Sequence, residues 1–264
     1  MNLKIQEQTS VLNFEDYKKL VLKDYYTIFL SRETSILGRR EVLSGKGKFG
    51  IFGDGKELPQ IAMNHFIENG DFRSGYYRDQ TLLMAQGYLT PEDHFAALYA
   101  HPDIKHEPMS AGRQMVGHFS NKLIDENGNW LDQTKQINHI SDVSSIGAQM
   151  PRLVGLAQAS KIYRKLDIRG SEKFSKNGNE IAWGTIGNAG TSEGIFFEAI
   201  NAIGVHQIPI VMSVWDDGYG ISVKNEKQTT KQSISDALDG FKKEEDSSGI
   251  EILTVKGWDY SELI

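Results

Sequence analysis

The chain has 264 residues, 39% of them apolar, and no cysteine, which excludes a disulfide framework and a zinc–thiolate site. A formal net charge of −6 at pH 7 argues against a general nucleic-acid surface. The N-terminus has no apolar signal core and no apolar run reaches membrane-spanning length. We therefore expect a cytoplasmic protein that binds neither nucleic acid nor a membrane.

The first 43 residues are expected to be mostly helical. Residues 1–12 are polar and predict a loose arm, whereas Asn13 can cap a helix whose first turn holds Glu15 and Asp16. The helix is expected to reach Leu43 in one or two pieces. Its apolar residues recur at roughly helical spacing: Leu20, Val21, Tyr25, Ile28 and Phe29.

Loops and short helices are predicted next. Residues 45–57 are rich in glycine and predict a loop, and residues 58–67 predict a helix. Thr90, followed by a proline and two acids, is a strong helix start. Residues 109–122 are irregular, and residues 120–139 are interpreted as a surface excursion.

A long helix is predicted over residues 148–164. Its small residues Ala148, Gly155 and Ala159 would let another backbone approach one face closely. This face therefore suggests that the helix meets a partner. Residues 167–180 form a polar linker.

The stretch after this linker is interpreted as one strand–helix–strand unit. Residues 181–186 form a short apolar strand that enters the glycine-rich turn GNAGTSEG, and an amphipathic helix follows. A second buried strand over residues 208–214 runs directly into two adjacent carboxylates, Asp216 and Asp217. Strands joined by a helix predict an α/β fold.

The C-terminal part carries weaker signals. Residues 234–241 predict a helix, and residues 250–255 predict a third buried strand. Asp259 and Glu262 have the spacing of a capping box, so a helix is expected to start where the sequence ends. We interpret the chain as a fragment of a longer protein.

The turn GNAGTSEG admits several interpretations. Its glycine spacing is not G-x-G-x-x-G, so the dinucleotide-binding fingerprint is absent. Ser192 stands in a G-x-S-x-G pattern, but the one later histidine, His206, precedes the acidic pair, so a hydrolase triad cannot be assembled in its usual order. A diphosphate and metal site at a helix N-terminus remains, and so does a plain turn capped by Thr191 or Ser192.

The second strand end favours the metal site. Asn188 and Asp217 follow neighbouring strands of the unit and lie 29 residues apart, the length of one crossover. Open α/β sheets bind ligands at the carboxyl ends of their strands. Oxygen atoms from both strand ends could therefore share a magnesium ion whose shell is completed by substrate phosphates.

Six motifs in order carry a family resemblance: YYRDQ, GRQMVGHF, SSIGAQMPRLVG, GNAGTSEGIFFEAINAI, DDGYGIS and VKGWDY. From about residue 40 to residue 264 the chain resembles the alpha subunit of the thiamine-dependent decarboxylating component of 2-oxoacid dehydrogenase complexes, most closely the branched-chain type. The resemblance implies a thiamine-diphosphate-binding α/β fold with a mostly parallel sheet and helices on both faces. It divides the chain into an N-terminal helical arm (1–40) and an alpha-type domain (41–264) that is truncated at its C-terminal end.

The resemblance also implies the positions of the site. Tyr77 and Arg78 would hold the diphosphate, although an arginine after two tyrosines is usually a solvated charge. Asn188, Asp217 and the Tyr219 carbonyl would bind Mg²⁺. The full set implied for thiamine diphosphate is Tyr77, Arg78, Ser144, Ile146, Gly187, Asn188, Ala189, Gly190, Asp217 and Tyr219. Gln114 and His118 match a motif near the substrate entrance, where a loop histidine would otherwise be an ordinary polar residue.

Two departures from the family pattern stand out. The family places a carboxylate at the first metal position and an amide at the second, whereas Asn188 and Asp217 exchange these types. Asp216 adds a negative charge, and Trp215 stands where some relatives have an arginine, so weaker cofactor binding is expected. The catalytic histidine of the family lies beyond Ile264 and its glutamate belongs to the beta partner, so no catalytic residue is expected within this chain.

The implied activity is oxidative decarboxylation of a small 2-oxoacid with transfer of the acyl group to a lipoyl carrier. The expected partners are a beta-type subunit or fused beta half and a lipoyl-bearing acyltransferase, within a homo- or hetero-oligomer. The chain alone is expected to be inactive. The alternative is a non-catalytic assembly module of the same fold whose cofactor site has lapsed.

Overall fold

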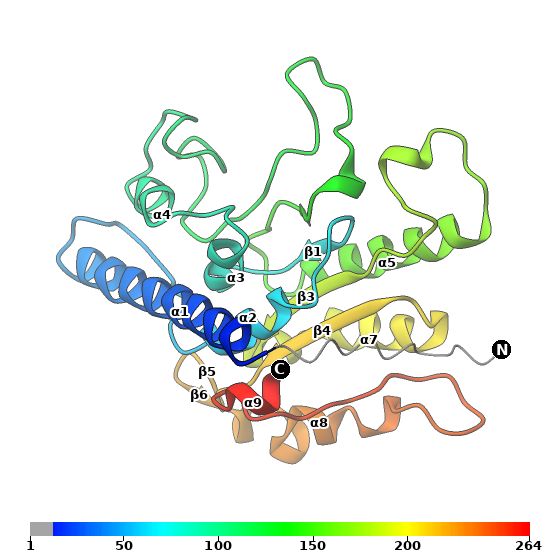
Figure 1. Cartoon of the computed structure of the whole chain (residues 1–264). Coiled ribbons are helices and arrows are strands. Elements are labelled where there is room, and N and C mark those ends of the chain that lie inside the picture. Colours follow the sequence, from blue (N-terminus) through cyan, green and yellow to red (C-terminus); the bar gives the residue numbers. More distant parts are fainter. Residues whose placement is uncertain (1–12) are drawn as a thin grey trace.

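The structure, a computed structural model, describes residues 13–264, and the polar arm predicted for residues 1–12 lies outside the described residues. Its centre is a four-stranded parallel sheet in the order β2-β1-β3-β4, with helices on both faces (Figure 1). The strands are β1 (Phe72–Ser74), β2 (Asn138–His139), β3 (Ala182–Gly187) and β4 (Ile210–Trp215). The predicted α/β class with a parallel sheet is confirmed.

Nine α-helices are assigned within the described residues. They are α1 (Phe14–Leu43), α2 (Glu57–Asn64), α3 (Gln80–Ala85), α4 (Pro91–Leu98), α5 (Gln149–Lys165), α6 (Asn188–Thr191), α7 (Gly194–His206), α8 (Ile234–Ala237) and α9 (Tyr260–Leu263). A small antiparallel pair joins β5 (Tyr219–Gly220) and β6 (Val223–Lys224). No helix between residues 13 and 264 combines the length and the apolar character needed to cross a bilayer.

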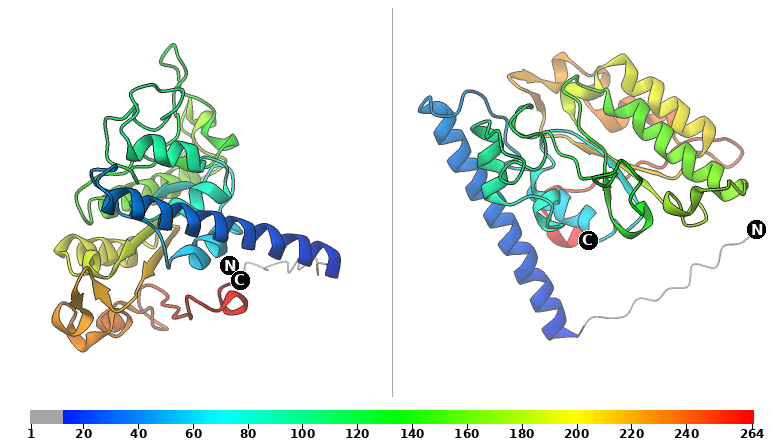
Figure 2. Two further views of the ribbon diagram at one scale, coloured as in Figure 1. Left: turned by 90° about the vertical axis from the view of Figure 1, so that its left-hand side faces the viewer. Right: turned by 90° about the horizontal axis from the view of Figure 1, so that it is seen from above.

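β3 separates two hydrophobic cores because successive side chains of a strand point to opposite faces. Ala182 and Ile186 pack in one cluster with residues of α5, α7 and α8. Trp183 lies in the other cluster, with residues of α2 and α3. Figure 2 shows α5 and α7 on one side of the sheet and α1 on the other. The expectation of helices on both faces is confirmed.

α1 begins where the sequence predicts, since Asn13 Oδ1 accepts a hydrogen bond from Asp16 N–H at 3.0 Å. The helix is unbroken and packs against α2, α3 and α4. Its buried residues are polar or small, whereas Tyr25 and Phe29 are exposed. Ser31 Oγ lies 2.8 Å from Thr81 Oγ1, so polar contacts hold the inner face. The apolar spacing in the sequence therefore predicted the helix correctly but not its buried side. The predicted boundary between an N-terminal arm (1–40) and an alpha-type domain (41–264) stays a prediction.

Two predicted helix starts differ in outcome. α4 starts after the Thr90 cap, as expected, and Thr90 and Asp93 also form a reciprocal capping box. Asp259 caps α9 by accepting from the backbone N–H groups of Ser261 and Glu262, both at 3.1 Å. The Glu262 carboxylate, however, accepts from Lys256 N–H at 3.2 Å, so the second half of the expected box is not formed.

Three predictions about the chain's course are corrected. Residues 250–255 form no strand; among the described residues their backbone makes one isolated bridge, Lys242 to Ile250, and Leu253 is exposed. The stretch 120–139 is not wholly a surface excursion, because it ends in β2, whose two residues are buried. The helix expected over 234–241 is split into α8 and a 3₁₀ turn.

Candidate functional site

All four parallel strands end at one edge of the sheet, and each leads into a segment that carries predicted site residues. β1 leads to Tyr77 and Arg78, β2 to Ser144, β3 to Asn188 and β4 to Asp217. The chain order reverses between β1 and β3, which lie side by side. Such a switch point at the carboxyl ends of the strands is where open α/β sheets bind ligands.

The end of β3 meets the end of β4 through Asn188. Its side-chain amide donates to Asp216 Oδ1 and to Asn225 Oδ1 (3.0 Å), and its Oδ1 accepts from the Asp217 N–H at 3.4 Å. Asp216 Oδ1 also accepts from Asn225 Nδ2 and Gly218 N–H, both at 2.9 Å. The Asp216 carboxylate is thus held inside the hydrogen-bond network of the turn.

Asp217 faces a different partner. Its Oδ2 lies 2.7 Å from the Lys56 ammonium, and its Oδ1 accepts from the Tyr219 N–H at 3.1 Å. Partial burial opposes ionisation of Asp217, but Lys56, the Tyr219 N–H and the charge of Arg78 outweigh it and hold the pKa of Asp217 below its ordinary value. Asp217 is therefore an ionised carboxylate at the edge of the sheet where the parallel strands end.

The loop after β1 brings aromatic rings and a cation to the same edge. Tyr76 packs against Trp215 at the end of β4, with ring centroids 5.5 Å apart. Its buried hydroxyl has no hydrogen-bond partner among the described residues, and burial raises the pKa of Tyr76 well above its ordinary value. Arg78 donates to the Phe52 carbonyl oxygen and stacks over the Tyr77 ring at 5.3 Å. Tyr76, which the sequence did not single out, thus joins the predicted Tyr77 and Arg78.

The glycine turn after β3 allows close approach. A Cβ at Gly187 would lie 3.2 Å from Tyr76 Oη, and one at Gly190 would lie 3.4 Å from Ile146 Cγ2. A Cβ at Gly220 would lie 2.7 Å from the Cβ of Ala189. These glycines let the turn, the loop of Ile146 and the β5–β6 hairpin come together at one place.

The loop before β2 meets the loop after it at two of the predicted residues. His118 Nε2 lies 2.7 Å from Ser144 Oγ, and Nδ1 lies 2.9 Å from the Met115 carbonyl oxygen. Gln114 is exposed and is tied to the loop through its backbone N–H, which donates to Ser110 Oγ at 3.2 Å. The structure therefore brings His118 and Ser144 together, whereas the Gln114 side chain makes no hydrogen bond to either of them within residues 13–264.

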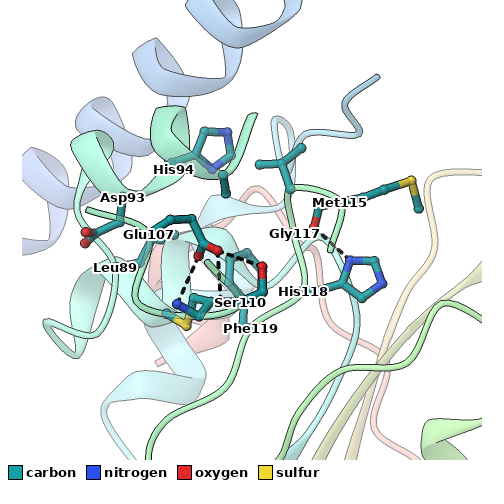
Figure 3. A pocket seen from close by; sticks show the side chains of 12 residues that line it. Leu89, Asp93, His94, Glu107, Ser110, Met115, Gly117, His118 and Phe119 are labelled. Atoms are coloured by element: carbon teal, nitrogen blue, oxygen red, sulfur yellow. Dashed lines mark hydrogen bonds between the residues drawn. The ribbon is translucent and has the colours of Figure 1, made fainter. Parts of the chain in front are cut away.

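A buried carboxylate organises the turn that precedes these residues. Glu107 is fully buried and accepts from the backbone N–H groups of Met109, Ser110 and Gly112 at 2.8–2.9 Å, and from the Ser110 hydroxyl at 2.6 Å. Figure 3 shows Glu107 and Ser110 facing each other and His118 bonded back to Met115 in the wall of the same pocket. The loop that carries Gln114 and His118 therefore starts from a fixed turn.

A buried ionic network joins three of the site's loops, and no local sequence pattern predicts it. Arg73 of β1 contacts Asp79 and lies 2.9 Å from Asp142 Oδ2. Asp79 Oδ1 accepts from the Thr185 hydroxyl at 2.7 Å, and Asp142 Oδ2 accepts from the Phe119 N–H at 3.0 Å. Arg78 and His118 are the direct neighbours of Asp79 and Phe119, and Ser144 follows Asp142 by two residues. The network therefore fixes the backbone from which these predicted side chains extend.

The residues present fit a magnesium diphosphate group. The Tyr76 hydroxyl, which has no partner within residues 13–264, can bond a phosphate oxygen, and Arg78 supplies a cation. Gly187 has no Cβ that would crowd this hydroxyl. Asp217 and Asn188 present oxygens of the kind that Mg²⁺ prefers. In the part of the chain that the structure describes, no three histidine, cysteine or acidic side chains are grouped so that they could hold a metal ion. Mg²⁺ commonly takes one or two carboxylates and fills its shell with phosphates and water.

The two competing interpretations of the turn lose support. Ser192 donates its hydroxyl to the Gln228 carbonyl oxygen at 2.9 Å, and His206 lies at the far end of α7. Within residues 13–264 the Ser192 hydroxyl therefore has no histidine as a hydrogen-bond partner. The plain turn is not capped as expected either. Thr191 donates to the Asn188 carbonyl oxygen at 2.6 Å, and Glu193 is the N-cap of α7 without a side-chain bond.

Comparison with known proteins gives a consistent picture. The family model "Dehydrogenase E1 component" matches residues 30–262. The chain is 29% identical over 244 residues to the 2-oxoisovalerate dehydrogenase subunit alpha of Bacillus subtilis (strain 168), covering 90% of this chain and 62% of the relative. It is 26% identical over 205 residues to the pyruvate dehydrogenase E1 component subunit alpha of Staphylococcus aureus (strain Mu50), covering 76% and 45%. The chain thus spans between about half and three fifths of the length of these relatives.

Proposed function

The chain belongs to the dehydrogenase E1 component family, and we propose that it supplies the diphosphate- and magnesium-binding half of a thiamine-diphosphate-dependent 2-oxoacid dehydrogenase. The reaction of the intact protein would be oxidative decarboxylation of a 2-oxoacid and transfer of the acyl group to a lipoyl carrier. The relatives that the chain resembles are named for 2-oxoisovalerate and pyruvate. A cytoplasmic location belongs to the same proposal.

One observation carries the proposal. The segments that follow β1, β3 and β4 carry a cation (Arg78), an amide oxygen (Asn188) and an ionised carboxylate (Asp217) at one edge of the sheet. The loop after β1 also carries the buried Tyr76 hydroxyl, which has no hydrogen-bond partner within residues 13–264. This is the donor set for an anionic diphosphate and its hard cation. When bound there, thiamine diphosphate would supply the electron sink that decarboxylation requires.

The chain's own residues would bind and orient. Asp217, Asn188 and the Tyr219 carbonyl would hold Mg²⁺, and Arg78 with Tyr77 would hold the diphosphate. The turn Gly187–Gly190 would line it, with Ser144 and Ile146 against the aminopyrimidine ring. His118, fixed through Met115 and Ser144, would form part of the substrate entrance together with Gln114.

We further propose a beta-type partner, either a separate subunit or a fused half, and a lipoyl-bearing acyltransferase that receives the product. Support comes from α5, where Gly155 is exposed and a Cβ built on it would meet no other atom within 4 Å, so another backbone could approach. α1 likewise exposes Tyr25, Tyr26 and Phe29. The catalytic groups would come from outside these residues, and the chain alone would be inactive.

Calorimetry tests the proposal on the protein complemented with its beta partner. Titration with thiamine diphosphate in the presence of Mg²⁺ should give saturable heat, and omission of Mg²⁺ should weaken it strongly. Absence of saturable binding would contradict the enzyme and favour the alternative, an assembly module of the same fold with a lapsed cofactor site.

A further inference from the structure

A lysine from a distant part of the chain reaches the acidic end of the candidate site. Lys56 lies 161 residues before Asp217, in the loop between α1 and α2, and its Nζ is 2.7 Å from Asp217 Oδ2. Its backbone is fixed on both sides: its N–H donates to the Gly53 carbonyl oxygen at 3.1 Å, and its carbonyl oxygen accepts from Gln60 Nε2 at 2.8 Å. An anchored turn therefore directs the ammonium to the site.

The position of Lys56 does not serve the helix that it precedes. Lys56 is the N-cap residue of α2, and its side chain makes no capping hydrogen bond. N-cap positions favour side chains that accept hydrogen bonds, and a cation there is opposed by the helix dipole. The Lys56 side chain therefore contacts Asp217 at the site and does not stabilise the start of α2.

The two partners of this ion pair are buried unequally. The side chain of Lys56 is 13% exposed, whereas that of Asp217 is 51% exposed. A half-exposed carboxylate can turn to another cation, but a buried ammonium left without an anion costs free energy. When Asp217 binds Mg²⁺, Lys56 therefore needs a new anion, and the diphosphate is the anion that arrives with the metal.

We propose that Lys56 is a diphosphate-binding residue of this chain, which exchanges Asp217 for a phosphate oxygen when the metal takes the carboxylate. The inference rests on the proposed function and adds a residue that the family motifs do not include. Arg78 is a second cation whose charge acts on Asp217. A lysine suits the exchange because its ammonium binds phosphate as a point charge and needs no fixed planar geometry.

The test compares Lys56→Met, which removes the charge but keeps an apolar stem, with Lys56→Arg. The matched control is Lys48→Met, an exposed lysine of the same loop. Calorimetry on the protein assembled with its beta partner measures two titrations, Mg²⁺ alone and thiamine diphosphate at saturating Mg²⁺. In Lys56→Met, Mg²⁺ alone should bind more tightly because Asp217 has lost a competing cation. Thiamine diphosphate should bind about tenfold more weakly.

In Lys56→Met the Mg²⁺ affinity should rise while the thiamine diphosphate affinity falls, and a purely structural role of Lys56 would not produce these opposite changes. Lys56→Arg should keep most of the diphosphate affinity, and Lys48→Met should match the wild type. A loss in both titrations of Lys56→Met, or an unchanged cofactor affinity, would overturn the role of Lys56 while the wild-type titration still supports the proposed function. No saturable cofactor binding by the wild type would overturn the proposed function and this inference together.

Discussion

His118 Nε2 and Ser144 Oγ lie 2.7 Å apart, which joins the loop before β2 to the loop after it. His118 Nδ1 lies 2.9 Å from the Met115 carbonyl oxygen, which can only accept, so Nδ1 carries a proton. In the neutral ring, Nε2 then accepts from the Ser144 hydroxyl. Both contacts fix the orientation of the ring at the edge of the sheet, where we place the substrate entrance.

His118→Asn should lower kcat/KM for the 2-oxoacid by about 100-fold, the size of effect expected when a positioned proton-transfer or orienting group is lost. The affinity for thiamine diphosphate should change much less than kcat/KM, because the ring lies outside the diphosphate contacts and is linked to the cofactor only through Ser144. Steady-state kinetics and calorimetry on the complemented protein measure the two quantities. His106→Asn, at an exposed histidine of the preceding loop, is the control. A kcat/KM equal to that of the wild type would remove His118 from the substrate pocket.

Asp216→Asn and Asp217→Asn should affect different properties. Asp216 accepts several hydrogen bonds inside the turn, so its neutral variant should lower the free energy of unfolding by about 1–2 kcal/mol. Asp217→Asn removes the carboxylate that faces outward and should weaken magnesium-dependent cofactor binding by at least about tenfold. Urea unfolding and calorimetry distinguish the effects. Equal losses of cofactor affinity would show that the metal ligand is placed wrongly.

Asp79 should make stability depend on pH. Two buried carboxylates share the Arg73 guanidinium, and burial raises the pKa of Asp79 to about 6. The folded protein then binds more protons than the unfolded chain between about pH 4 and pH 6, so this group's stabilisation is lost as pH rises through that window. Asp79→Asn lacks this titration. The free energy of unfolding of the variant minus that of the wild type should therefore be about 3 kcal/mol larger at pH 7 than at pH 4. A difference between the two proteins that does not vary with pH would contradict this.

The strand–helix–strand unit was predictable because its elements are long enough to show a period. β3 and β4 each hold six residues, and the segment between β3 and α7 is rich in glycine, which predicts a turn. β1 and β2 have only three and two residues, among them the polar Arg73, Asn138 and His139, so they show no apolar period. Their burial depends on partners elsewhere in the chain, which no local pattern reports.

The proximity of the candidate residues was predictable where they follow strand ends and unpredictable where contacts cross the chain. Asn188 and Asp217 could be paired because one crossover separates them. Lys56 meets Asp217 across 161 residues, and Arg73 meets Asp142 across 69, so only the folded structure shows these pairs. Tyr76 was not predicted because what distinguishes it is a buried hydroxyl without a partner within residues 13–264. That property depends on the folded surroundings of Tyr76 and leaves no local sequence pattern.

Glu107→Gln should loosen the loop that carries His118. Burial opposes ionisation of Glu107, but the Ser110 hydroxyl and three backbone N–H groups outweigh it and lower its pKa. Its stabilisation is therefore present above about pH 4.3 and lost as pH falls through the lowered pKa. At pH 7 the variant should lose about 1–3 kcal/mol of unfolding free energy, and proteolysis of the loop should quicken. Urea unfolding at pH 7 and pH 3 should show the gap to wild type narrowing in acid, with exposed Glu126→Gln as the control. A gap of constant size would mean that the charge of Glu107 does not hold the turn.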